Sequence, residues 1–195
     1  MIGNHRVEGY AIVSADGMIA DAGGDMPPSI RNDADQRFLQ AELDRAAVVV
    51  HGRHSHEGGP RAAGRKRLIL TRAIKAIAPD PDHPNTLLWN PAGAGFEEAL
   101  TALAPGRGPG VIAIIGGTDV FGRFLPLYDA FHLTRAARAN IPGGRAVFPE
   151  VGSGMTPEAV LTRHGLKPGA PRVIDAPAAI TLTTWQRDAR PAGGH

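Results

Sequence analysis

Apolar residues follow two patterns along this chain, and their alternation predicts strands separated by helices. Residues 33–45 show helical spacing, because Phe38, Leu39 and Leu43 fall on one face of a helix. Helices are also expected at 96–104, 119–125 and 157–164. Apolar runs of strand length occur at 7–14, 46–50, 67–71, 86–89, 111–115 and 130–136.

The end of the chain carries a different signal. Segments 172–175 and 180–186 read as consecutive closing strands, the second alternating Ile180, Leu182 and Thr184 with the residues between them. Strands that alternate with helices predict an α/β sandwich around a mostly parallel sheet. The two closing strands predict an antiparallel edge at its C-terminal side.

Composition limits the class of protein. The 195 residues are 43% hydrophobic and 21% charged with a net charge of +2, as expected for a single globular domain over 1–195. Aromatic residues make up only 5%, and no basic run is interleaved with them, so a nucleic-acid partner is not expected. The absence of Cys excludes disulfides and thiolate metal sites. There is no signal-like apolar segment and no membrane-length run, so we expect a cytoplasmic protein with no membrane partner. The tail from about residue 188 is expected to be disordered.

Two segments that follow predicted strands carry candidate binding chemistry. Gly52-Arg53-His54-Ser55 offers a guanidinium, an imidazole and a hydroxyl directly after an apolar strand. Ile115-Gly116-Gly117-Thr118-Asp119-Val120-Phe121 places a glycine pair where another strand runs into a helix. Glycines allow backbone N–H groups to approach an anion closely, and the Arg fork can bond two phosphate oxygens.

In this order the two segments resemble the dihydrofolate reductase superfamily, which also contains the pyrimidine reductase of riboflavin synthesis. The similarity covers most of residues 7–150 and extends to Leu70-Thr71-Arg72, Phe131-His132-Leu133-Thr134 and Val147-Phe148-Pro149. It implies a dihydrofolate-reductase-like three-layer fold and NADPH as cofactor, with a cis peptide at the glycine pair. The implied cofactor contacts are Ala20, Gly52, Arg53, His54, Ser55, Thr71, Arg72, Ile115, Gly116, Gly117, Thr118, Asp119, Val120 and Phe121.

The resemblance also implies a substrate side. Segments 16–20 and 26–27 resemble the two ends of the family's loop over the nicotinamide. Asp35 matches the catalytic acid on the following helix, where it would hydrogen-bond the N–H groups of a heterocycle; Asp33 is a rival for this role or a cap of the helix. The implied substrate contacts are Ile12, Met26, Leu39, Arg65 and Thr134.

Some residues depart from the dihydrofolate reductase pattern. Pro27-Pro28 lacks the Trp that helps to order the folate pocket, and Phe121 replaces a Tyr. The opening Ser14-Ala15-Asp16-Gly17 resembles pyrimidine reductases, whereas Ile115 departs from the Glu usual in that branch. The expectation is an NADPH-dependent reductase of a small heterocycle, with dihydrofolate first. The alternatives are a pyrimidine reductase, a reductase of unassigned specificity, and a nucleotide-binding protein without turnover.

Two further expectations concern metals and assembly. The histidines His51, His54 and His56 lack a distant partner at ligand-like spacing, so no metal is expected. Relatives of this type occur as monomers and dimers, and the sequence leaves both states open.

Overall fold

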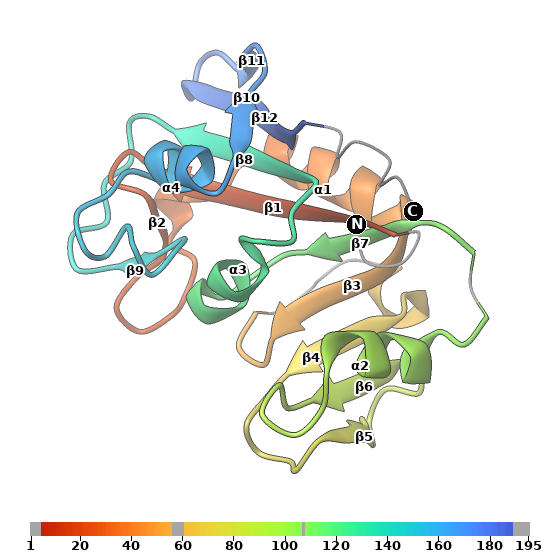
Figure 1. The fold of residues 1–195 in the computed structure, drawn as a ribbon. Helices are drawn as coiled ribbons and strands as arrows, with labels where there is room; N and C mark the ends of the chain where they lie inside the picture. Colours follow the sequence, from red (N-terminus) through yellow and green to blue (C-terminus); the bar gives the residue numbers. More distant parts are fainter. Residues whose placement is uncertain (1–4, 56–60, 107, 189–195) are drawn as a thin grey trace.

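One large mixed sheet organises the chain, whose computed structural model describes residues 5–55, 61–106 and 108–188 (Figure 1). Along the sheet the strands lie in the order β10-β12-β8-β1-β7-β3-β4-β6-β5, and β11 pairs with β12. The expected disorder of the tail concerns residues outside the described part. The strands of the sheet are β1 (Arg6–Ser14), β3 (Ala46–Gly52), β4 (Arg67–Leu70), β5 (Ile77–Pro79), β6 (Thr86–Trp89), β7 (Val111–Ile114), β8 (Ala130–Ala136), β10 (Leu166–Pro168), β11 (Arg172–Asp175) and β12 (Ile180–Arg187).

The middle of the sheet is parallel and both edges are antiparallel. Strands β8, β1, β7, β3, β4 and β6 run in the same direction. Strand β12 is antiparallel to β8, which confirms the predicted C-terminal edge. At the opposite edge β5 is antiparallel to β6, and this short strand was not predicted. A separate ribbon pairs β2 (Met18–Ala20) with β9 (Arg145–Ala146).

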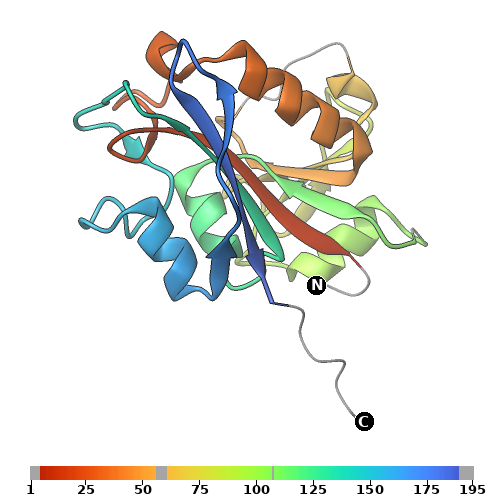
Figure 2. The same ribbon diagram turned by 90° about the horizontal axis from the view of Figure 1, so that it is seen from above.

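Helices cover both faces of the sheet and complete three layers. Figure 2 shows α1 (Asp33–Arg45) on one face, with α2 (Phe96–Leu103), α3 (Thr118–Phe124) and α4 (Pro157–Arg163) on the other. Two 3₁₀ turns, η1 (Pro28–Ile30) and η2 (Ala62–Gly64), lie in connections. The predicted α/β sandwich is therefore confirmed. None of the helices in the described segments has the length and apolar character needed to cross a membrane.

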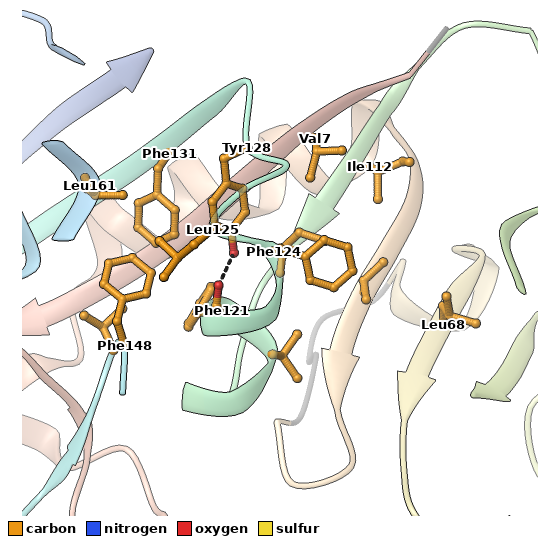
Figure 3. Close-up of a cluster of buried hydrophobic side chains, with 14 of the residues drawn as sticks. Val7, Leu68, Ile112, Phe121, Phe124, Leu125, Tyr128, Phe131, Phe148 and Leu161 are labelled. Carbon is orange, nitrogen blue, oxygen red and sulfur yellow. Dashed lines mark hydrogen bonds between the residues drawn. The ribbon is translucent and has the colours of Figure 1, made fainter. Parts of the chain in front are cut away.

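Side chains alternate along the central strands and so contribute to the hydrophobic cores on both faces of the sheet. In β3, Val48 and Val50 join the core beneath α2–α4, whereas Val49 between them joins the core beneath α1. Because these strands lie between helices, both faces are apolar, as the unbroken apolar runs predict. The larger core holds a group of aromatic rings around α3 (Figure 3), where the hydroxyl of Tyr128 donates to the carbonyl of Phe121 at 3.2 Å.

Helix α1 begins where the sequence predicted, but a different residue caps it. The side chain of Asn32 accepts hydrogen bonds from the backbone N–H groups of Ala34 (2.9 Å) and Asp35 (3.1 Å). The expectation that Asp33 could cap the helix was wrong, because Asp33 is already the first helical residue. The amide of Asn32 also donates to the carboxylate of Asp175 at 2.7 Å. This bond fixes the start of α1 against β11.

Candidate functional site

A cleft of about 1450 Å³ crosses the carboxyl ends of the parallel strands. It follows the residues after β3, β4, β6 and β7, and then continues between α1 and strands β1 and β8. Crevices at the carboxyl ends of parallel strands are where open α/β sheets bind ligands. The cleft therefore has two ends of different character: one of loops and glycines, and one formed by α1 against the sheet.

The loop end brings together the two segments predicted to bind the cofactor. The backbone N–H of Gly52 donates to the carbonyl of Gly116 at 3.1 Å, which ties the residues after β3 to those after β7. The hydroxyl of Ser55 lies so close that a Cβ added to Gly116 would approach it to 2.7 Å. Gly117 has a φ of +84°, a conformation that favours glycine. The described residues contain no cis peptide bond, so the cis bond expected at this glycine pair is absent.

Cationic side chains border this end of the cleft. Arg53 and His54 are exposed and line it, together with Thr71 and Arg72. Arg72 pairs with Asp119 at 3.4 Å, and both side chains are largely exposed, so the pair contributes little to stability. Ala20, Ile115, Thr118 and Phe121 also line the cleft. Of the expected cofactor contacts, Val120 alone is absent from this lining; it is buried beneath the glycines.

Asp35 lies at the other end of the cleft. It is buried on α1 and lines the cleft with Ile12, Met26, Leu39 and Thr134. Burial raises the pKa of Asp35, and a hydrogen bond from the hydroxyl of Thr134 opposes this rise only in part. A carboxyl group in this environment can hold a proton closer to neutral pH than an exposed aspartate can. Asp33, the rival acid, is exposed at the same helix end and lines the cleft as well.

The structure adds residues to the cleft that the sequence interpretation did not select. Tyr10, Phe38 and His132 form an aromatic group beside Asp35, and Arg31, Arg123 and Arg145 add positive charge along the cleft. The signal for the aromatic group was present in β1, where charged Glu8 and polar Tyr10 interrupt a buried strand on one face.

Arg65 is not among the residues that line the cleft. Its guanidinium is buried and donates to the carboxylate of Asp44 at 2.7 Å and to the side chain of Gln40 at 2.9 Å. Both partners are on α1, so Arg65 binds this helix to the segment before β4. The substrate role predicted for Arg65 has no support from this geometry.

The histidine cluster offers no metal site in the part of the chain that the structure describes. No group of three or more His, Asp or Glu side chains there is placed to hold an ion. His51 is buried on β3, with its Nδ1 2.9 Å from the carbonyl of Gly52, whereas His54 is exposed at the cleft. His56 lies outside the described residues.

Glu8 is the buried acid of the aromatic group. Its carboxylate accepts hydrogen bonds from Tyr10 Oη (2.8 Å), Arg6 Nε (3.0 Å) and His132 Nε2 (3.3 Å). Burial alone would raise the pKa of Glu8, but these hydrogen bonds outweigh it and lower the pKa from 4.5 to about 2. The ionised form is therefore favoured in the folded protein.

This pKa predicts an acid-dependent loss of stability. Because the pKa of Glu8 is lowered on folding, its contribution is complete above pH 4.5 and is lost as the pH falls to about 2. The loss corresponds to about 3 kcal/mol. Urea unfolding at several pH values should show that Glu8→Gln lacks this dependence, whereas Glu97→Gln, at an exposed position of α2, retains it. Equal pH dependence in wild type and Glu8→Gln would contradict the assignment.

Comparisons with known proteins bear on the fold. No protein-family model and no curated protein sequence matches the chain. Among solved structures, a riboflavin biosynthesis protein from Shewanella sp. PV-4 is similar, with a TM-score of 0.63 and 19% identity over 94% of this chain and 99% of that one. Dihydrofolate reductase from Enterococcus faecalis, complexed with NADP(H) and RAB-propyl, has a TM-score of 0.63 and 20% identity over 94% and 97%.

A third solved structure is longer than this chain. It is the diaminohydroxyphosphoribosylaminopyrimidine deaminase/5-amino-6-(5-phosphoribosylamino)uracil reductase of Thermotoga maritima, with a TM-score of 0.64 and 17% identity. The match covers 94% of this chain but 57% of that protein. At these identities the likeness shows the fold: the chain has a dihydrofolate-reductase-like fold, as its motifs predicted.

Proposed function

We propose that this protein is an NADPH-dependent reductase that transfers hydride to a small nitrogen heterocycle. The observation that carries the proposal is the position of buried Asp35 at one end of a cleft whose other end is built from Gly52, Ser55, Gly116 and Gly117. A cleft of about 1450 Å³ has room for a dinucleotide and a second small molecule together. The solved structures that are similar to this chain include reductases, which supports the same class of reaction.

The loop end of the cleft fits a phosphate-bearing cofactor. Its glycines leave backbone atoms accessible, and a Cβ at Gly116 would collide with Ser55. Arg53 and Arg72 place guanidinium groups at the same end, and buried Thr71 also lines the cleft. Arg72 and Thr71 would meet the 2′-phosphate that distinguishes NADPH from NADH. When bound, the nicotinamide supplies a hydride, which is two electrons and one proton.

Asp35 would bind the acceptor and organise the second proton. Reduction of a C=N bond requires a hydride on carbon and a proton on nitrogen, and NADPH becomes NADP⁺. The raised pKa of Asp35 allows its carboxyl group to share a proton with a ring N–H or amino group. Thr134 orients this carboxyl group from β8, while Ile12 and Leu39 provide apolar contacts for a flat ring.

The sequence motifs and the similar structures support two candidate acceptor classes: pteridines such as dihydrofolate, and aminopyrimidines of the riboflavin pathway. Purified protein with NADPH and each acceptor should show a fall in absorbance at 340 nm. Turnover with either class supports the reductase. Tight NADPH binding without turnover on any pteridine or pyrimidine would instead favour a nucleotide-binding protein that has lost catalysis.

A further inference from the structure

We propose that Tyr10, supported by His132 and Phe38, is a specificity-determining residue that limits the substrate to a single-ring heterocycle. This inference rests on the proposed function, because it concerns the compartment in which Asp35 would bind the acceptor. None of the three aromatic residues is required for the hydride transfer itself. Their effect is on the size of the ring that fits beside Asp35.

The register of the sheet places Tyr10 next to the position of the acid. Strands β1 and β8 pair Ile12 with Thr134, and the adjacent same-face pair along the two strands is Tyr10 with His132. Thr134 is the residue that hydrogen-bonds Asp35. Phe38 follows Asp35 by one helical turn on α1 and contacts both members of the second pair. The three rings therefore occupy the compartment immediately beyond Ile12 and Thr134.

The rings of this group pack closely. Tyr10 and His132 are stacked with 4.7 Å between centroids and an interplanar angle of 10°. Phe38 lies 5.6 Å from His132 and 6.2 Å from Tyr10, and Arg172 lies over its ring at 5.9 Å. Tyr10 lines the cleft but is only 4% exposed, because neighbouring residues pack around most of its ring. The ring therefore has little space to move away from a ligand.

Hydrogen bonds hold the two stacked rings in place. The hydroxyl of Tyr10 donates to Glu8 at 2.8 Å, and the two nitrogens of His132 lie 3.3 Å from Glu8 and 3.1 Å from the hydroxyl of Thr184. Rotating Tyr10 away would remove a hydrogen bond from an ionised carboxylate that is 12% exposed. Loss of such a bond is costly inside a protein, so Tyr10 does not move aside readily for a larger ring.

The substrate class follows from these surroundings. Ile12, Asp35 and Leu39 line the cleft together with Tyr10. In this proposal a single flat ring lies against Ile12 and Leu39, presents an N–H or amino edge to Asp35 and remains clear of Tyr10. A second ring fused to the first on the side of Tyr10 and His132 would meet these two stacked rings. The geometry therefore favours an aminopyrimidine over a pteridine.

The test uses two ligands with the same hydrogen-bonding edge and different sizes. 2,4-Diaminopyrimidine and 2,4-diaminopteridine would be titrated calorimetrically into wild type, Tyr10→Val and Tyr10→Phe, each saturated with NADP⁺. We expect wild type to bind the pyrimidine at least tenfold more tightly. Tyr10→Phe retains the ring but loses the hydrogen bond to Glu8, so it should lower this ratio less than Tyr10→Val, which should lower it at least tenfold. Thermal unfolding confirms that each variant is folded.

The outcomes separate this inference from the proposed function. Wild type that binds the pteridine equally or more tightly overturns the role of Tyr10, whatever the behaviour of the variants. An unchanged ratio in folded Tyr10→Val also overturns it. Asp35→Asn should weaken both ligands alike, and if it changes neither, the assigned compartment itself fails. If Tyr10→Val does not fold, Phe38→Leu removes the supporting ring and should lower the same ratio.

Discussion

Asp35→Asn should reduce kcat/KM for the best acceptor by a factor of about 10² to 10⁴, the range typical of a lost general acid or base. The amide keeps the size of the side chain and can still accept a hydrogen bond from Thr134, so the change removes mainly the ionisable group. NADPH affinity should be unchanged, because the glycine loops lie at the other end of the cleft. Steady-state kinetics and NADPH titration measure the two effects separately.

The matched control is Asp33→Asn, two residues earlier on the same helix. Asp33 is exposed, so its replacement should change kcat/KM by less than about threefold. If Asp33→Asn abolished turnover and Asp35→Asn did not, the catalytic assignment would pass to Asp33.

Asp35→Asn should also affect stability, but it should not lower the free energy of unfolding in the way that it lowers activity. Because the pKa of Asp35 is raised on folding, the ionised side chain destabilises the folded protein above that pKa. The penalty disappears below its unfolded value of 3.8, where the carboxyl group is protonated in both states. Asp35→Asn should therefore be at least as stable as wild type at pH 7, and any advantage should vanish towards pH 3.

Gly9→Ala should lower the free energy of unfolding by about 3 kcal/mol, the upper end of the usual cost of overpacking. Gly9 lies in β1, and an added Cβ would be 2.3 Å from Phe131 Cδ2 and 2.9 Å from Tyr128 Cε1. Figure 3 shows these two rings within the aromatic group of the larger core, and both side chains are fully buried. The melting temperature should fall by about 6 to 12 °C.

Gly108→Ala is the control for this substitution, because an added Cβ there meets nothing within 4 Å. Its effect should stay within about 0.5 kcal/mol. Urea unfolding of both variants measures the difference. A Gly9→Ala protein as stable as the control would show that the aromatic core tolerates an extra methyl group.

The long elements could be predicted because their patterns are strong. Helix α1 occupies 33–45 and β8 occupies 130–136, as the sequence indicated. Strands β2, β5, β9 and β10 were missed because two or three residues cannot show a period. Their positions depend on neighbours: β5 exists as a strand only through its pairing with β6.

The candidate site was predictable where motifs lie within one segment and not where distant residues combine. Gly52-Arg53-His54-Ser55 and the glycine pair at 116–117 do meet in space. The contact between Glu8 and His132 spans 124 positions, so no local pattern could reveal it. Arg65 was selected from a motif, but its ion pair with Asp44 depends on the packing of α1.

The bond between Asn32 and Asp175 has a consequence for biosynthesis. During translation α1 emerges early, but its anchor at Asp175 and the strand that covers β8 are among the last described segments to leave the ribosome. Until then β8 is an open edge with unpaired backbone groups, available to strands of other nascent chains. Chains interrupted before β11 should therefore expose this edge of β8 to association with other chains.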